Sequence, residues 1–163
     1  MTAAPRTALY ALVAATLAFK LWLSAVFPVT GDEAYFIYWG AAPALGYYDH
    51  PPMVGWLLAL LWHLSDAPWV LRLPVTLLPA AMSLSLYWVL RKEDEDKAAL
   101  AALGLLLVPI HVWDVFVTTD APLVLWSFLS GLAFWRASRD DDYRWYLGAG
   151  ALLGLAFLSK YFA

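Results

Sequence analysis

Residues 31–52 concentrate the side chains that could do chemistry. Their sequence, GDEAYFIYWGAAPALGYYDHPP, holds three carboxylates, one histidine and six aromatic rings between two apolar segments. Acidic side chains beside a bilayer are costly unless the protein uses them. Asp32 and Glu33 come first, at the start of an expected interfacial helix whose aromatic residues share one face. One carboxylate would suffice to cap that helix, so the second needs a reason of its own.

Asp49 and His50 form a second candidate group. Two prolines, Pro51 and Pro52, follow them, restrict the backbone and set the start of the next helix. A carboxylate beside an imidazole could bind a divalent cation, orient a phosphate through a protonated histidine, or simply form a turn. Two ligands do not make a metal site, so the sequence leaves these alternatives open.

A third polar group, Thr118-Thr119-Asp120, precedes Pro122. Threonine or aspartate here could cap a helix that has proline in its first turn. Asp120 is also expected on the same membrane face as the first two groups. That shared face favours one common site over separate local roles as helix caps and a turn.

Composition indicates the class of protein that must position these groups. Of the 163 residues 63% are hydrophobic and only 14% are charged, whereas about a quarter of the residues in a soluble domain are charged. Mean hydropathy is +0.67. The sequence therefore predicts an all-α integral membrane protein. The net charge of −3 is too small to indicate a nucleic-acid partner, and the absence of cysteine excludes disulfides and thiolate metal sites.

Five apolar runs predict about five transmembrane helices. Residues 53–64 are too short to cross a ~30 Å hydrocarbon layer, and we expect an interfacial or re-entrant helix there. Residues 1–163 then form a single membrane domain, with an extracytoplasmic loop at 30–68 that carries interfacial helices. Most basic residues fall on one side, which predicts a multi-pass protein of the cell membrane with a cytoplasmic N-terminus. The runs are residues 7–29, 69–90, 98–113, 122–135 and 143–158.

The acids divide between the two sides of this topology. Those at 93–96 and 140–142 lie in cytoplasmic loops among basic residues, where a solvated turn explains them. The other six lie on the outer side, where Arg72 and Lys160 are the only bases near the ends of the expected spans. Lys20 is the only charged residue that lies more than a few positions inside an expected span. The outer acids are Asp32, Glu33, Asp49, Asp66, Asp114 and Asp120.

Five segments together resemble a known family of membrane enzymes. With these five segments in the same order along the chain, the sequence resembles the N-terminal part of the GT-C glycosyltransferases. The resemblance is to the protein O-mannosyltransferase and aminoarabinose transferase type, in glycosyltransferase families 39 and 83. The resemblance implies transfer of a sugar, with inversion, from a polyprenyl-phosphate donor to a lipid, glycan or protein acceptor outside the cytoplasm. The segments are GDEAYFIYWG, GYYDHPPMVGWLLAL, LRLPVTLLPAAMSLSLYWVLRK, VTTDAPLVLWSFLSGLAFWRA and GLAFLSKYFA.

The resemblance implies roles for individual residues. Asp32 matches the acid proposed as general base, Glu33 would position the acceptor or the base, and Asp120 matches an acid lining the same cavity. Asp49 matches an acid near the donor phosphate that could hold a metal. His50 stands where some relatives have lysine, which favours a metal ligand over a phosphate clamp. Tyr48, His50 and Lys160 are expected to bind substrate.

The resemblance also sets expectations for cofactors and partners. A divalent metal (Mg, Mn or Zn) could assist the departing phosphate, and no nucleotide cofactor is expected. Membrane lipids and the lipid-linked donor are the expected partners. Relatives continue for several hundred residues, so we expect this chain to be the N-terminal part of a longer enzyme and to be inactive alone. The competing hypothesis is a non-catalytic membrane module, such as a transporter half, a lipid-binding subunit or a degenerate remnant.

Overall fold

The computed structural model describes residues 4–161, and it is built from helices throughout that range, with no strand. The described part begins with α1 (Ala4–Val26), α2 (Gly31–Ala41) and α3 (Met53–Trp62). It continues with α4 (Pro68–Leu71), α5 (Leu73–Leu90) and α6 (Glu95–Leu106). The last helices are α7 (Pro109–Trp113), α8 (Asp120–Asp140) and α9 (Tyr143–Phe157). The predicted all-α class is confirmed for these residues.

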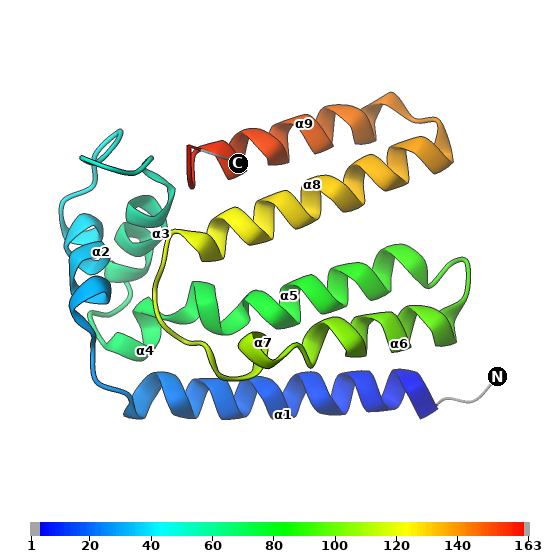
Figure 1. Cartoon of the computed structure of the whole chain (residues 1–163), viewed down its shortest axis with the longest axis horizontal. Helices are drawn as coiled ribbons and strands as arrows, with labels where there is room; N and C mark the ends of the chain where they lie inside the picture. The colour runs from blue at the N-terminus through cyan, green and yellow to red at the C-terminus, as the bar shows by residue number, and fades with distance from the viewer. Residues whose placement is uncertain (1–3, 162–163) are drawn as a thin grey trace.

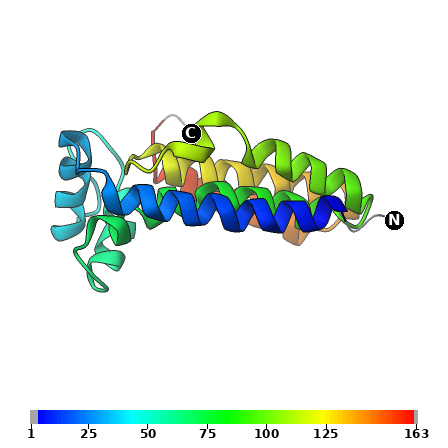
Figure 2. The ribbon, with the colours of Figure 1, turned by 90° about the horizontal axis from the view of Figure 1, so that it is seen from below.

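Five helices, α1, α5, α6, α8 and α9, lie along one common axis (Figure 1). Following the chain, each runs opposite to the one before it, as the alternating charge pattern of the loops predicted. Seen from below, α6 and α7 lie on one side of α1 and α5 (Figure 2). Between α1, α5 and α6 the core consists of small and branched residues, among them Leu9, Ala99, Ala102 and Leu106.

Two helical stretches are long and apolar enough to cross a membrane, Pro5–Val26 and Pro68–Leu90. The predicted count of about five spans is therefore not confirmed. The expected span at 98–113 is divided in two, because the helix ends at Leu106 and a new short helix begins at Pro109. The expected span at 69–90 is interrupted by a turn at Arg72 between α4 and α5. Among the other three expected spans, the one at 122–135 corresponds to α8, which extends beyond it at both ends.

The expected loop at 30–68 contains two helices, α2 and α3, packed against each other. They approach closely at Gly40, where an added Cβ would lie 2.6 Å from the Leu58 Cβ. Trp39 and Leu58 are buried at this contact, and the Tyr47 ring stacks on Trp39 with centroids 4.2 Å apart. The aromatic residues of this segment thus form a small core that fixes α2 on α3.

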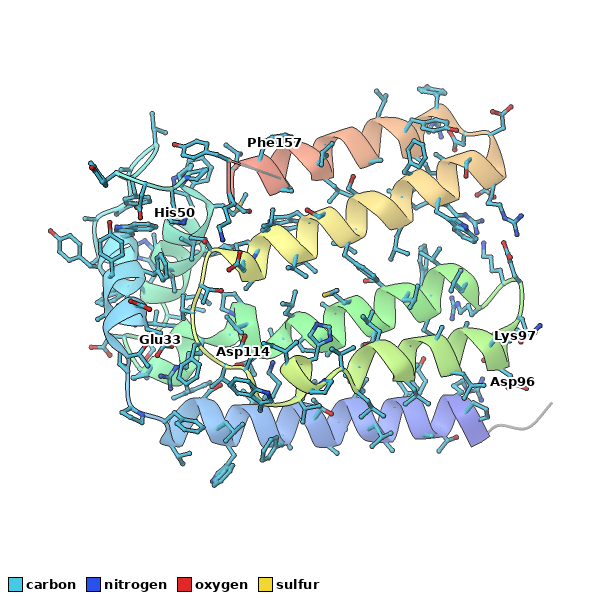
Figure 3. All side chains as sticks on the ribbon, viewed as in Figure 1. Glu33, His50, Asp96, Lys97, Asp114 and Phe157 are labelled. Carbon is cyan, nitrogen blue, oxygen red and sulfur yellow. The ribbon has the colours of Figure 1, made fainter. Side chains whose placement is uncertain are left out.

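The bundle has two different ends (Figures 1 and 3). We call one the hairpin end: it carries the start of α1 and the α5–α6 and α8–α9 turns. The other, the α2 end, carries α2, α3, α4, the segment between α7 and α8, and the end of α9. Figure 3 shows Asp96 and Lys97 at the hairpin end and Glu33, His50 and Asp114 toward the α2 end. The two sets of acids that the predicted topology assigned to opposite sides therefore lie at opposite ends of the bundle.

Candidate functional site

The first turn of α2 places Asp32 and Glu33 in different environments. Thr30 caps the helix: its hydroxyl accepts the Glu33 N–H at 3.3 Å, and its own N–H donates to Glu33 Oε2 at 3.1 Å. This reciprocal arrangement is a capping box. It turns Glu33 into the protein, where it is 1% exposed, and leaves Asp32 exposed to solvent.

Glu33 is held by Arg72, which is also 1% exposed. Arg72 Nε donates to Glu33 Oε1 and Nη2 donates to Oε2, both at 2.8 Å. The remaining guanidinium donors bind three carbonyl oxygens at the end of α1, those of Ser24, Phe27 and Pro28, at 2.8–2.9 Å. A fully paired buried guanidinium of this kind fixes the geometry on both sides.

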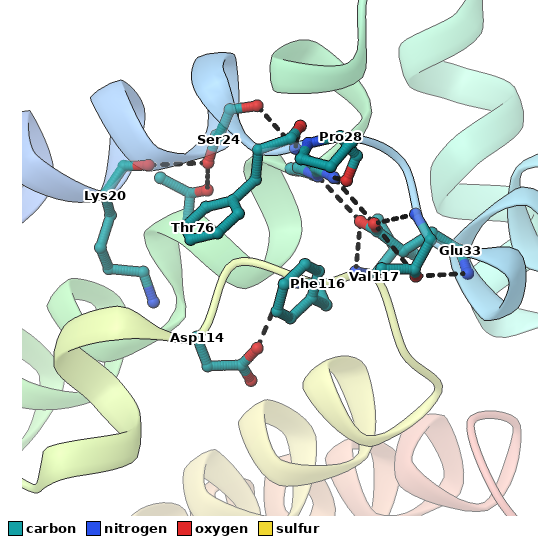
Figure 4. A network of polar contacts seen from close by, with 11 residues as sticks. Lys20, Ser24, Pro28, Glu33, Thr76, Asp114, Phe116 and Val117 are labelled. Carbon is teal, nitrogen blue, oxygen red and sulfur yellow. Dashed lines mark hydrogen bonds and ion pairs between the residues drawn. The ribbon is translucent and has the colours of Figure 1, made fainter.

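A third segment joins the same carboxylate. The Val117 N–H donates to Glu33 Oε1 at 3.1 Å, so the chain between α7 and α8 is attached to α2 (Figure 4). Burial acts to raise the pKa of Glu33, but hydrogen bonds from Arg72, Thr30 and Val117 act more strongly and lower it below its ordinary value. Glu33 is therefore an ionised anchor that connects α1, α2, α5 and the segment before α8.

Asp32 differs from Glu33 in having no such anchors. No other side chain in residues 4–161 hydrogen-bonds or ion-pairs with its carboxylate. It is exposed at the second position of a helix whose first turn is fixed from within. The arrangement presents one accessible carboxylate on a rigid support, as a base that must meet an incoming hydroxyl requires.

Asp49 and His50 lie beside the aromatic core of α2. His50 Nδ1 is 3.1 Å from Asp49 Oδ2, within ion-pair range, and the Tyr35 hydroxyl donates to Asp49 Oδ1 at 3.4 Å. The His50 imidazole lowers the pKa of Asp49 below its ordinary value. Tyr48 projects fully into solvent, with 100% of its surface exposed.

This pair does not by itself complete a metal site. In the part of the chain that the structure describes, no three His, Cys, Asp or Glu side chains come close enough to hold one ion. Asp49 and His50 would be two ligands of a set that needs at least one more. The metal-binding role of these two residues stays a prediction.

Asp120 and Lys160 meet although 40 residues separate them. Lys160 Nζ donates to Asp120 Oδ1 at 2.6 Å, which joins the first turn of α8 to the end of α9. The Met53 N–H also donates to the Leu158 carbonyl at 3.0 Å. The chain just after Pro52 therefore lies against the residues just before Lys160, and Figure 3 shows His50 and Phe157 in the same region.

A cavity of about 300 Å³ lies inside this end of the bundle. Asp120 lies at the exposed part of its lining, whereas Lys20 is 1% exposed. The Lys20 ammonium donates to the Val75 carbonyl at 3.1 Å and to the His111 carbonyl at 3.2 Å. The polar part of the lining consists of Lys20, His111, Asp114, Thr118 and Asp120.

The family of the chain follows from its sequence match. Residues 49–163 match the family described as dolichyl-phosphate-mannose-protein mannosyltransferase. The chain belongs to this family. The predicted resemblance to GT-C glycosyltransferases is thereby confirmed, and a role in glycosyl transfer is supported. Asp49, His50, Asp120 and Lys160 lie inside the matched range, and Asp32 and Glu33 lie before it.

A curated relative extends the match. The chain is 30% identical over 134 residues to the lipid A galacturonosyltransferase RgtD of Rhizobium johnstonii (strain DSM 114642 / LMG 32736 / 3841). The alignment covers 80% of this chain and 28% of the relative, so the chain spans under a third of that protein's length. No solved structure matches the chain.

Two residues of this mannosyltransferase-family chain gained importance only in the structure. Arg72 stood out in the sequence as one of two bases on the acidic side, and Lys20 as the charge within an expected span. These two unusual charge positions were the signal in the sequence that could have drawn attention to Arg72 and Lys20. Neither identified its partner, because Arg72 and Glu33 are 39 residues apart and Lys20 bonds to carbonyls 55 and 91 residues away.

Proposed function

We propose that this chain forms the first part of a glycosyltransferase that moves a sugar from a polyprenyl-phosphate donor to an acceptor on the outer face of a membrane. Two things support the proposal: the family to which the chain belongs, and one observation on the structure. The exposed Asp32, on a support fixed by the Glu33–Arg72 pair, lies at the same end of the bundle as the Asp120–Lys160 pair. A base and a cation for a leaving phosphate thus share one end.

Asp32 is the general base of this reaction. Its carboxylate takes the proton from the acceptor hydroxyl as the hydroxyl oxygen attacks the anomeric carbon. The bond from that carbon to the phosphate oxygen breaks, and polyprenyl phosphate leaves with the bonding electrons. Attack opposite to the leaving group inverts the anomeric centre. Glu33 is a positioning residue, because its oxygens are occupied by Arg72, Thr30 and Val117.

Lys160 meets the negative charge that grows on the departing phosphate. A fixed cation there stabilises the transition state more than the ground state. Asp120, at 2.6 Å, holds the ammonium in place and lines the adjoining cavity. His50 and Tyr48 lie on the neighbouring segment, where they would contact the donor from the α3 side.

The proposed membrane arrangement follows the two ends of the bundle. In this arrangement the five helices that lie along the common axis all cross the membrane. The hairpin end faces the cytoplasm, and the α2 end faces outward. Basic residues concentrate at the hairpin end, at positions 6, 91, 92, 97, 136, 139 and 144, as expected for a cytoplasmic side.

The name of the relative narrows the substrates. RgtD is a lipid A galacturonosyltransferase. A uronosyl sugar is therefore our first candidate for the transferred group, and a glycolipid is our first candidate for the acceptor.

Replacing Asp32 tests the reaction directly. In the purified full-length enzyme that contains this chain, we expect Asp32→Asn to lower the rate of sugar transfer from polyprenyl-phosphate donors by about 10²- to 10⁴-fold, as loss of a general base does. Asp66→Asn is the matched control, because Asp66 is an exposed acid of the same loop. Both variants should unfold at the wild-type temperature, because neither carboxylate is buried.

Two results would contradict the proposal. Near-normal turnover by the Asp32→Asn protein would remove Asp32 as the base. Donor binding by the wild-type full-length enzyme without transfer to any lipid, glycan or protein acceptor would instead favour a lipid-binding module.

A further inference from the structure

Lys20 is a buried charge that the proposed reaction does not use. It lies in the middle part of α1, six residues before the end of that helix at Val26. Within residues 4–161 no carboxylate forms an ion pair with its ammonium, and Asp114 attracts it only from a longer distance. Two carbonyl oxygens accept two of its three N–H groups, those of Val75 and His111.

An ammonium group in this position is expensive. Burial of a charge is strongly unfavourable unless an opposite charge and hydrogen bonds compensate for it. Carbonyl oxygens supply only part of this compensation, because they carry partial charges. Among the described residues Asp114 attracts this ammonium from the same cavity, but no carboxylate contacts it. A buried lysine with hydrogen bonds and no contacting carboxylate is suited to an anion that arrives with a ligand.

The cavity lined by Lys20 fits a single sugar ring. Its volume of about 300 Å³ lies at the lower limit for ligand pockets. Each of the two acids in its lining already has one oxygen occupied: Asp120 pairs with Lys160, and Asp114 Oδ1 accepts the Phe116 N–H. Carboxylate oxygens can still accept hydrogen bonds from hydroxyl groups. The lining thus combines acceptors for hydroxyls with one deep cation.

We propose that Lys20 binds the carboxylate of an acidic sugar, and so selects a uronosyl donor over a neutral one. This inference rests on the proposed function, because it takes the cavity as the place of the donor sugar. The lining extends from Asp120, whose side chain is 57% exposed, to the fully buried Lys20. The donor phosphate would lie near Lys160 at the exposed side, and the sugar carboxylate would reach Lys20 at the buried side.

The first experiment needs no variant. The purified full-length enzyme that contains this chain is placed in lipid nanodiscs and titrated with polyprenyl-phosphate galacturonate, polyprenyl-phosphate galactose and bare polyprenyl phosphate. We expect the galacturonate to bind about 10- to 100-fold more tightly than the galactose, as expected for a buried charge-assisted hydrogen bond. Equal binding of these two donors overturns the inference, whether or not any variant folds.

The second experiment assigns the preference to Lys20. Lys20→Gln keeps an N–H donor and removes the charge, and should bind the two sugars almost equally. Lys20→Arg keeps the charge and should retain part of the preference. Lys97→Gln is the matched control, because Lys97 is an exposed lysine at the hairpin end. A Lys20→Gln protein that still prefers galacturonate overturns the inference.

Bare polyprenyl phosphate distinguishes the two possible anions. If Lys20→Gln weakens this ligand as much as it weakens the galacturonate, then Lys20 binds phosphate and the inference is wrong. If only the galacturonate is weakened, Lys20 binds the sugar carboxylate. Because these measurements record binding, they are independent of turnover. A protein that prefers galacturonate but transfers no sugar would refute the proposed function and leave the role of Lys20 intact.

Discussion

The two ends of the bundle use the same residue types in different ways. At the hairpin end the ion pairs lie in solvent: Arg139 and Glu93 meet at 2.7 Å with side chains 55% and 43% exposed. At the α2 end, Arg72 and Glu33 meet at 2.8 Å, each 1% exposed. The geometry of the two contacts is almost equal, so only their surroundings distinguish them.

This difference separates exposed from buried roles. Acids at the hairpin end cap the helix that follows them, as Asp94 does by accepting the Lys97 N–H before α6. Asp142 does the same for α9 by accepting the Arg144 N–H. Glu33 also takes part in a cap, but it connects segments 39 and 84 residues away as well. Acids at the hairpin end therefore cap helix N-termini or form exposed ion pairs. Glu33 is buried where several segments meet, and it assembles the region that carries Asp32.

The strongest test of this comparison removes one partner from the buried pair. Arg72→Met leaves the Glu33 carboxylate buried without its counter-ion, which costs about 3–5 kcal/mol of folding free energy. We expect a protein that unfolds at much lower denaturant concentration and has lost transfer activity. The measurement is chemical unfolding followed by tryptophan fluorescence in detergent.

Arg139→Met is the matched control for Arg72→Met. Its partner Glu93 remains in water after the change, so no measurable loss of stability is expected. If the two arginine variants lost stability equally, burial would not be what separates the ends.

Acid provides a second and smaller test. The pKa of Glu33 is lower in the folded protein than its ordinary value, so ionised Glu33 stabilises the fold at neutral pH. This contribution is present above the unfolded pKa of about 4.3 and is lost as pH falls through the folded pKa. We expect wild-type stability to fall more steeply below pH 4 than that of Glu33→Gln, which is less stable at pH 7.

The control for the acid test is Glu95→Gln. The pKa of Glu95 is also lowered, by the Tyr87 hydroxyl and Arg6, but its side chain is 30% exposed. Its acid dependence should therefore differ little from wild type. A Glu33→Gln protein that follows the wild-type acid curve would show that Glu33 is not the anchor.

The sequence predicted what depends on neighbouring residues. Hydropathy gave the helical class, and the charges of the turns correctly separated the acids into two ends. The prolines at 51 and 52 marked the start of α3. Asp32 and Glu33 were recognised as a pair in which each member needed its own explanation, and the structure gives them different surroundings.

The remaining features depend on contacts between distant segments. The division of residues 98–113 into α6 and α7 brings the His111 carbonyl to Lys20, which a continuous span would not have suggested. The partner of Arg72 could have been any of six outer acids. Charge pattern identifies an excess on one side, but only packing decides which acid is buried with the arginine.

The smallest expected effect comes from salt and the exposed pair. A double-mutant cycle with Arg139→Met and Glu93→Gln should give a weak coupling energy at low salt, and 1 M NaCl should abolish it, because the Debye length is then about 3 Å. The cycle with Arg72→Met and Glu33→Gln should keep its coupling in the same salt, since ions do not reach that pair. Unfolding midpoints of the four proteins in each cycle provide the measurement. If salt weakened both couplings alike, water would have access to the Glu33–Arg72 pair, and the rigid support proposed for Asp32 would not exist.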